Sequence, residues 1–379
     1  MAYPINYDGK LKPNEVYATI YNMIISQQVF ADNVKIKNKF INRVDGGLYG
    51  DTKLYYATDA LALYDWGGDE EATKLLELNR PETPKCQSIT LDTFKQLRLT
   101  LDNYLTKRAW MGADAFSSFN SIMLGWMRET KRIYDSRLNK VFRGTYETAE
   151  GKQSLTINLP TDESNQEAEN RLQAQTIAKT IADIHTALED EDRNYNDYGN
   201  IRSYDKSEFD IVFNADYANK ITNMDVPTIY HKDGLIDVSL NMPSKYFGTV
   251  GTVTGTAITS DGLTYRSLLG GWVTLAEDTI IKGETVAKGT RVFLFPGDII
   301  PNKIQVASTT AIVVPFYVEN SKVMFKFIHK QDIPYMSAFE AGTNFFNPRA
   351  LVETHYTTFG HNELQHLHNF PLITVKAGN

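Results

Sequence analysis

The pattern of apolar positions predicts one long helix from Lys107 to Asn139. Within it, apolar side chains recur at spacings of three, four, three and seven residues, at Phe116, Phe119, Met123, Trp126 and Ile133. This spacing places them on one face of a helix. Basic residues toward its end, Lys131, Arg132 and Arg137, complement the helix dipole. A helix over residues 113–138 would be about 39 Å long, and Gly125 is its one weak position.

The chain before this helix predicts an arm and an extended excursion. Residues 1–40 give a loose arm followed by a helical pattern. Residues 41–106 then predict a strand around Tyr55 and Tyr56, a short helix over 69–78, and a strand from Gln87 that is interrupted near Thr93. Little in this excursion is able to form a core of its own. We therefore expect it to need a partner surface.

The chain after the helix predicts a compact α/β region. A short strand over 154–159 precedes a helix with an apolar face at Ile177, Ile181, Ile184 and Leu188. The polar stretch from Glu189 to Gly199 is a candidate boundary. A buried strand over 209–214 and a short helix over 215–221 follow, which gives the alternating order typical of α/β folds.

A glycine-rich and β-prone segment, residues 240–307, predicts a small β module inserted into this region. Two similar fragments within it, 277–283 and 284–289, are expected to form successive arms of a hairpin. Strands are predicted again over 311–318 and 322–328. The chain is expected to end with a strand pair, 351–359 and 372–376.

Composition and charge narrow the function. The 379 residues are 42% hydrophobic, and 46 acidic against 39 basic residues give a net charge of −7. A protein that grips nucleic acid needs a concentrated basic face, which argues against that class but not against one that encloses nucleic acid. The single cysteine, Cys86, fits a reducing cytoplasm. With no signal-like start and no long apolar run, we expect neither secretion nor membrane insertion.

Catalytic and metal motifs are weak. Four histidines lie near the C-terminus, at His355, His361, His366 and His368, and a metal site is one interpretation. Structural histidines are favoured, because the spacing does not match a helical zinc motif and no Asp or Cys stands beside them in the sequence. No nucleophile elbow, phosphate loop or acid–base pair can be named, so an enzyme is the weakest class. The four tryptophans, Trp66, Trp110, Trp126 and Trp272, are expected in the core by default and at interfaces otherwise.

The order of these segments resembles a tailed-bacteriophage major capsid protein of the Hong Kong 97 type. Two stretches, Ser207 to Ile221 and Lys322 to Ile328 followed by the Asn347-Pro-Arg-Ala-Leu turn and the strand from His355, are similar to elements in small podophages of Gram-positive hosts. The turn has Ala350 where the podophage pattern has glycine.

The resemblance implies an α+β capsid fold with these parts: an N-terminal arm and helix (1–40), an extended loop (41–106), a spine helix and peripheral domain (107–200), an axial domain (201–239 and 308–345), the inserted β module (240–307), and returning peripheral strands (346–379). The function implied is self-assembly into hexamers and pentamers of an icosahedral shell around double-stranded DNA, in a virion capsid assembled in the bacterial cytoplasm. The alternative is another virion structural protein, such as a tail, connector or receptor-binding component.

The implied partners are copies of the chain, scaffolding and portal proteins, and packaged DNA bound without sequence specificity. No membrane, cofactor, metal or catalytic residue is expected. A shell subunit needs large surfaces complementary to its own copies, so extended arms without a core are physically reasonable. The candidate assembly contacts are aromatic and basic side chains on the excursion, the helix and the late turn: Tyr55, Tyr56, Trp66, Arg98, Lys131, Arg132, Arg137 and Arg349.

Overall fold

The computed structural model describes residues 42–46, 51–63, 78, 80–102, 113–146, 153–161, 165–222, 241–252, 263–275, 277–281, 283–301, 315–363 and 365–378. The predicted N-terminal arm and helix, Trp66, Trp110 and residues 69–77 lie outside these ranges. The chain divides into two compact units, each built from separate stretches of sequence. The first comprises residues 1–39, 95–136 and 340–359, and the second comprises 40–94, 137–339 and 360–379.

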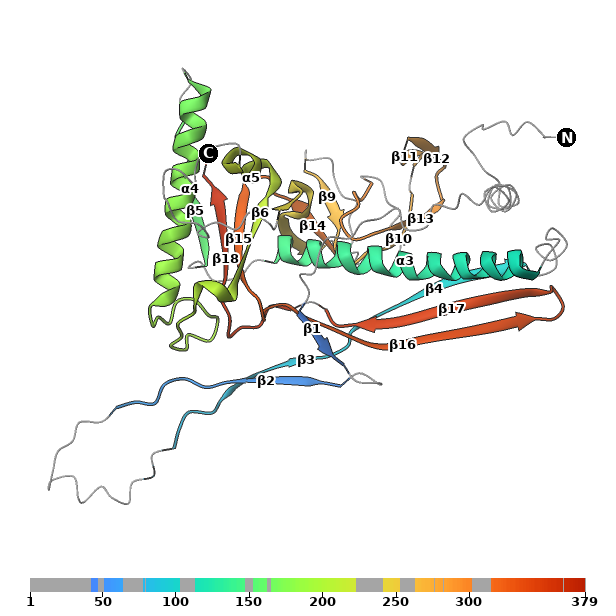
Figure 1. Cartoon of the computed structure of the whole chain (residues 1–379), viewed down its shortest axis with the longest axis horizontal. Coiled ribbons are helices and arrows are strands. Elements are labelled where there is room, and N and C mark those ends of the chain that lie inside the picture. Colours follow the sequence, from blue (N-terminus) through green and yellow to red (C-terminus); the bar gives the residue numbers. More distant parts are fainter. Residues whose placement is uncertain are drawn as a thin grey trace. The chain divides into compact units, whose positions relative to one another are not determined.

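The first unit contains long stretches of three strands and most of the long helix. These elements are β4 (Thr93–Asp102), α3 (Ala113–Thr145), β16 (Pro334–Asn347) and β17 (Val352–His361), each of which continues into the second unit. β17 is hydrogen-bonded on one side to β16 and on the other to β4 (Figure 1). The sheet order is β1-β16-β17-β4, where β1 is Asn42–Asp45. The hydroxyls of Thr100 and Thr354 are 3.1 Å apart, and the buried Tyr134 packs on Phe359 with ring centroids at 5.8 Å.

A five-stranded mixed sheet is the centre of the second unit. Its order is β5 (Ser154–Ile157), β18 (Leu372–Ala377), β15 (Val323–His329), β6 (Phe209–Asn214) and β7 (Asn241–Met242). β15 is antiparallel to both β18 and β6, and all seven of its residues are buried. A strand covered on both faces is expected to be almost continuously apolar, as β15 is apart from Lys326 and His329.

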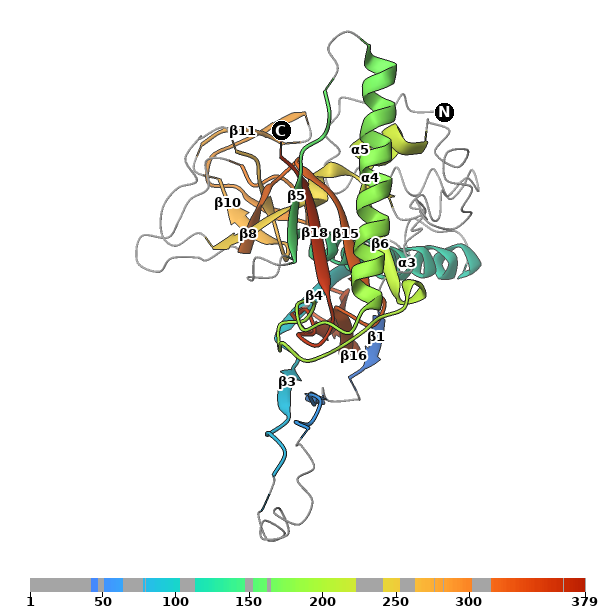
Figure 2. The ribbon, with the colours of Figure 1, turned by 90° about the vertical axis from the view of Figure 1, so that its left-hand side faces the viewer.

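Helix α4 (Gln166–Glu189) covers one face of this sheet, as Figure 2 shows. Its predicted apolar stripe is confirmed: Ile177, Ile181, Ile184 and Leu188 are buried in one core with Phe213 of β6 and Phe325 of β15. The helix begins after Asn165, whose side-chain oxygen accepts hydrogen bonds from two backbone N–H groups of the first turn. The short helix α5 (Ala215–Thr222) follows β6 as predicted.

Small sheets make up the glycine-rich region. β14 (Pro315–Glu319) pairs with both β8 (Gly248–Thr252) and β9 (Tyr265–Ser267), while β10 (Gly271–Thr274) pairs with β13 (Arg291–Leu294). The predicted hairpin is confirmed by β11 (Thr279–Ile281) and β12 (Glu284–Val286), which pair antiparallel. The remaining described elements are the 3-10 turns η2 (Lys206–Glu208) and η3 (Ser244–Tyr246), the strand β1 (Asn42–Asp45), parallel to β16, and the hairpin of β2 (Lys53–Ala57) and β3 (Lys85–Ile89).

The long helix differs from its prediction in length and in the face that it buries. α3 continues past Asn139 to Thr145, because Leu138, Val141, Phe142 and Thr145 are buried and extend the apolar pattern. Trp126, placed on the apolar stripe, is 55% exposed, whereas the adjacent Met127 is buried. Successive helical residues point about 100° apart, so the buried face is rotated by one residue from the predicted one.

One other prediction is wrong. The last two strands do not pair with each other: β17 lies beside β16 and β4, whereas β18 lies between β5 and β15 of the five-stranded sheet. Leu188 before the polar stretch Glu189 to Gly199 and Phe209 after it belong to the same core cluster. The wider division into peripheral and axial domains stays a prediction.

Candidate functional site: an anchored hairpin

The extended excursion contains a two-stranded hairpin with one covered face and one open face. β2 (Lys53–Ala57) and β3 (Lys85–Ile89) lie side by side and are antiparallel (Figure 1). Tyr55 is opposite Gln87, and Tyr56 is opposite Cys86. Because strand side chains alternate between faces, Leu54 and Tyr56 share a face with Cys86. Leu54 is 52% and Tyr56 66% exposed. The open face is therefore apolar.

The covered face attaches the hairpin to the C-terminal segment. Ile89 is buried with Met336 and Leu367, and Tyr55 packs against them. The side-chain amide of Gln87 donates to the backbone oxygen of His366 at 2.8 Å and accepts from the backbone N–H of His368 at 3.0 Å. One side chain thus satisfies two backbone groups that are 279 and 281 residues away in the sequence, which fixes the position of β3.

A second attachment joins the ends of the two strands to the loop after α4. The carboxylate of Asp59 accepts from the backbone N–H of Ile201 at 2.9 Å and pairs with the Arg193 guanidinium. The backbone oxygen of Thr58 accepts from Arg202, and Lys85 donates to the backbone oxygen of Tyr198. The Ile201 N–H, followed by Arg193, lowers the pKa of Asp59 to about 2. The carboxylate is ionised at neutral pH and holds the loop to the hairpin.

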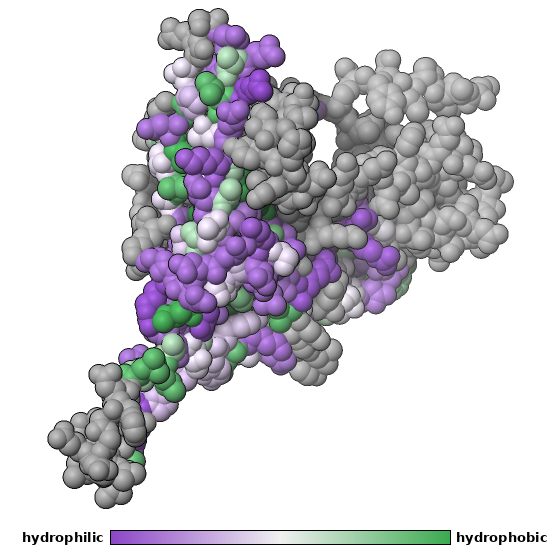
Figure 3. All heavy atoms as spheres, turned by 60° about the vertical axis from the view of Figure 1, so that its left-hand side comes forward, coloured by the Kyte–Doolittle hydropathy of each residue, from purple (hydrophilic) through white to green (hydrophobic). Residues whose placement is uncertain are grey.

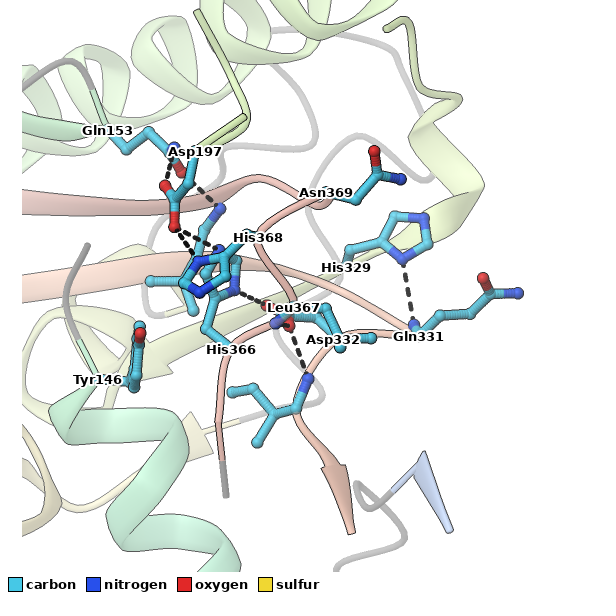
Figure 4. Close-up of polar contacts among 12 residues, drawn as sticks. Tyr146, Gln153, Asp197, His329, Gln331, Asp332, His366, Leu367, His368 and Asn369 are labelled. Atoms are coloured by element: carbon cyan, nitrogen blue, oxygen red, sulfur yellow. Dashed lines mark hydrogen bonds and ion pairs between the residues drawn. The ribbon is translucent and has the colours of Figure 1, made fainter. Parts of the chain in front are cut away.

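Two histidines and two aspartates form a cluster close to these attachments in the chain, and Figure 4 shows their polar contacts. His366 is fully buried, and its Nδ1 is 2.6 Å from Asp332 Oδ2. The other oxygen of Asp332 accepts from the backbone N–H groups of Leu367 and Ile333. His368 Nδ1 lies 2.7 Å from Asp197 Oδ2. The same Asp197 oxygen is 3.8 Å from His366 Nε2, which has no hydrogen-bond partner.

The charges of this cluster determine the protonation of His366. Burial alone lowers the pKa of an imidazole, but here the Asp332 charge and hydrogen bond, aided by Asp197, outweigh burial and raise the pKa of His366 above its ordinary value. Each imidazole has a carboxylate partner. Among the described residues, no group of three His, Cys, Asp or Glu side chains could hold a metal. The geometry is that of a structural clamp joining the loop after α4, the turn after β15 and the segment before β18.

The sequence did not predict this cluster, because it rests on partners far apart in the chain. Asp332 and Asp197 are 34 and 171 residues from the histidines that they contact. The sequence showed only that four histidines lie near one another close to the C-terminus. The exposed leucines of the excursion, Leu54, Leu61, Leu63 and Leu78, were also missed, although Leu54 alternates with Tyr56 in the period of a strand.

The structure distributes the predicted assembly residues over both units. On the excursion, Tyr55 is half-buried in the covered face and Tyr56 is exposed, while Trp66 lies outside the described residues. Arg98 on β4 is exposed and donates to Gln96 at 2.9 Å. Arg349 is exposed in the turn after β16, where the Asn347 side chain accepts from its backbone N–H. These positions are compatible with contacts to other molecules, which stay a prediction.

The three basic residues of α3 have intrachain partners. Lys131 lies over the Phe359 ring, with its Nζ 5.3 Å from the centroid, and Arg132 pairs with Glu129 one turn earlier. Arg137 is half-buried and pairs with Asp298 at 2.6 Å. Of the two tryptophans in the described ranges, Trp126 and Trp272 are 55% and 59% exposed, so the core expectation is wrong for both. Trp272 contacts Phe293 on the neighbouring strand, with the rings edge to face.

The fold of this chain, but not its sequence, is similar to that of known proteins. No protein-family model matches the sequence, and a sequence comparison with curated proteins finds no match. A chain in the capsid structure of Staphylococcus phage Andhra superposes with a TM-score of 0.60 at 10% identity, over 93% of this chain and 87% of that one. This chain has a phage capsid fold. A chain in the structure of the head fiber and inner core protein gp22 of bacteriophage P68 superposes with a TM-score of 0.54 at 9% identity, over 91% and 87%.

The phage capsid fold agrees with the mixed α and β content. None of the helices in the described ranges is long and apolar enough to cross a membrane. At 9–10% identity the similarity is one of fold alone. The α+β capsid fold expected from the order of segments is thus supported at this coarser level. The Hong Kong 97 subdivision and the kinship with podophages stay predictions.

Proposed function

We propose that this chain is the major capsid protein of a tailed phage, of the Hong Kong 97 type, and that it assembles with its own copies into hexamers and pentamers of an icosahedral shell around double-stranded DNA. Its partners are other copies of the chain, a scaffolding protein and a portal protein, and its role is structural, without catalysis or a cofactor. It resides in the virion capsid after assembly in the bacterial cytoplasm. Kinship with podophages of Gram-positive hosts is part of the same proposal.

The observation that carries this function is the open face of the anchored hairpin. Leu54 and Tyr56 are uncovered on this face, and Leu61 and Leu63 are exposed in the chain just after β2, Leu63 by 98%. Figure 3 shows hydrophobic residues on the described part of this segment, at the lower left of the view. Large exposed apolar side chains that follow one another along one segment mark an interaction site. The hydrogen bonds of Gln87 and Asp59 hold the β2–β3 hairpin in one position before any partner binds. Binding therefore does not have to supply the free energy of ordering the hairpin.

A second copy of the chain is the occupant that fits best. A capsid fold is built to contact its own copies, and repeated heterologous contacts between identical subunits generate rings and closed shells. The net charge of −7 also suits the inner surface of a shell that encloses DNA. A strongly basic surface would bind the phosphate backbone of the genome tightly.

The direct test is to express the chain alone and together with the scaffold gene of its phage, and to examine the product by negative-stain electron microscopy. We expect closed shells, tubes or hexameric rings. A discrete monomer or trimer that never forms larger particles under either condition would reject the capsid function and favour a tail, connector or receptor-binding component.

A variant pair tests the hairpin itself. Replacing both Leu54 and Tyr56 by serine removes apolar contact from the open face, and we expect particles to be lost because central interface aromatics contribute about 2 kcal/mol or more each. Ile280→Ser is the matched control, since Ile280 is 72% exposed in the β11–β12 hairpin. Circular dichroism should show both variants folded. Normal particles from the double variant would show that this face makes no assembly contact.

A shortened arm gives a third measurement. Replacing residues 60–83 by a short Gly–Asn linker keeps β2, β3, Asp59 and the Gln87 attachment. We expect a folded subunit that does not assemble. If the shortened chain is unfolded, the excursion contributes to the core of the subunit and is not an arm.

A further inference from the structure

Four cationic side chains gather around Tyr246 in the second unit, and two of them are neutralised. Arg137 pairs with Asp298 at 2.6 Å, and Arg266 pairs with Glu319 at 2.8 Å. Both arginines are at least two-thirds buried by their side-chain exposures of 31% and 12%. Arginine is the cation best matched to carboxylates, so the two acidic groups of this cluster are already engaged.

The two lysines of the cluster have no such partner. Lys140 of α3 and Lys245 of η3 both place their ammonium groups over the ring of Tyr246, at 5.6 and 5.1 Å from its centroid. Within the part of the chain that the structure describes, neither has a carboxylate within ion-pair distance. Both side chains are half-buried, so they are partly desolvated and yet reachable from solvent.

The folded protein disfavours the charged forms of Lys140 and Lys245. Burial, followed by the charges of Lys245 and Arg137, lowers the pKa of Lys140. Burial, followed by Arg137 and Arg266, lowers the pKa of Lys245, although Asp298 and Glu319 act in the opposite direction. Lysines kept half-buried beside other cations are destabilised unless an anion from outside joins them.

The framework around the lysines is rigid. Tyr246 is buried with Val141 and Tyr317, and the Tyr317 hydroxyl donates to the backbone oxygen of Lys245 at 2.7 Å. A Cβ atom on Gly297 would come within 2.8 Å of the Tyr246 ring. The ring on which both ammonium groups lie therefore has a fixed position, and the two lysines converge without an induced rearrangement.

We infer that Lys140 and Lys245 form a binding site for a phosphate group over the Tyr246 ring. A phosphate dianion carries the charge of two lysines and presents oxygens in several directions, which suits two separate point-charge donors better than the planar carboxylate does. The phosphate could come from a nucleic-acid backbone or be free in solution. The inference does not depend on the proposed capsid function.

Site-resolved lysine labelling of the purified full-length chain tests the site. Reductive methylation attacks only neutral amines, and mass spectrometry reports each lysine separately. At pH 8 and constant ionic strength, we expect inorganic phosphate to slow labelling of Lys140 and Lys245 by up to about tenfold, since the neutral fraction falls tenfold when a pKa rises by one. The exposed Lys179 on α4 is the internal control and should not change.

Added ligands distinguish the source. Protection by a short DNA duplex as well as by phosphate assigns the site to a nucleic-acid backbone, and protection by phosphate alone assigns it to a free phosphate. No protection by either, equal protection by polyglutamate, or equal slowing at Lys179 would overturn the inference.

Binding of radiolabelled phosphate by equilibrium dialysis gives an independent readout. The double variant Lys140→Met and Lys245→Met should lose binding, and Lys179→Met should retain it. If the double variant does not fold, labelling of the unmodified chain still decides the question.

Discussion

At the scale of residues, the buried histidines differ in the direction in which the fold shifts their pKa. Burial lowers the pKa of His185 and of His329, so each is neutral in the folded chain near pH 7. His366 is more deeply enclosed, but it has the Asp332 carboxylate at 2.6 Å and Asp197 beyond it, and its pKa is raised. A buried histidine is therefore not described by its burial alone. The charges that surround it decide whether it holds a proton.

The raised pKa of His366 makes stability depend on pH above the ordinary histidine range. A group whose folded pKa exceeds its unfolded value near 6.5 stabilises the folded state fully below that pH, and the effect is lost as pH rises through the folded pKa. We expect the urea midpoint of the chain to fall as the pH rises above the ordinary pKa of histidine, near 6.5. In His366→Gln this fall should be smaller, because no proton is released from the cluster.

His355→Gln is the matched control for loss of an imidazole outside the cluster, since His355 lies on β17 beside Glu353. Asp332→Asn should flatten the slope as His366→Gln does, because it removes the negative charge that holds the proton. Parallel pH profiles for the parent chain and His366→Gln would contradict the assignment of a charged His366.

At the scale of elements, helix α3 contains two glycines with opposite surroundings. Gly125 is exposed, and a Cβ atom added there meets no atom within 4 Å. Gly144, one residue before the end of the helix, faces η3 so closely that an added Cβ would lie 2.0 Å from the backbone oxygen of Tyr246. A rigid backbone atom cannot yield as a side-chain end can. Gly125 therefore only weakens the helix, whereas Gly144 is required because no larger residue fits against η3.

Alanine substitutions should separate these two roles. Gly125→Ala should stabilise the chain by about 0.5–1 kcal/mol, because alanine loses less backbone entropy in a helix. Gly144→Ala should destabilise it by about 1–3 kcal/mol, because overpacking forces the backbone of η3 away despite the gain in helix propensity. The free energy of unfolding from urea denaturation measures both. Equal effects of the two substitutions would show that the contact with Tyr246 can relax at little cost.

At the scale of the whole molecule, the single cysteine reports on the open face of the hairpin. Cys86 is exposed and lies opposite Tyr56 in the β2–β3 pair. If this face is covered by another copy of the chain, iodoacetamide should modify Cys86 quickly in free subunits and at least about tenfold more slowly in assembled particles, since an interface core excludes water and reagent. Particles unfolded in urea should recover the fast rate, which controls for oxidation. Equal rates before and after assembly would place this face outside every subunit contact.

The sequence by itself determined the elements whose apolar period is strong. The stripe of α4, the buried strand β6 and the β11–β12 hairpin follow from local spacing and turn residues, and all lie where the pattern predicts. The order of segments also led to the phage capsid fold without any matching family model. Local periodicity succeeds because burial of one face is imposed on each element separately.

Only the tertiary structure decided which face of α3 is buried and which polar groups meet. The sequence favoured the face of Trp126, but the face of Met127 is covered, because an aromatic-rich helix offers two adjacent apolar faces and its neighbours select one. Gln87 and His366, or Asp197 and His368, are brought together by chain topology over separations that no local pattern spans. The spacing of hydrophobic residues is a local property of the chain, whereas the partner of a hydrogen bond is set by the fold. The position of the β2–β3 hairpin depends on such partners and could not be predicted from the spacing.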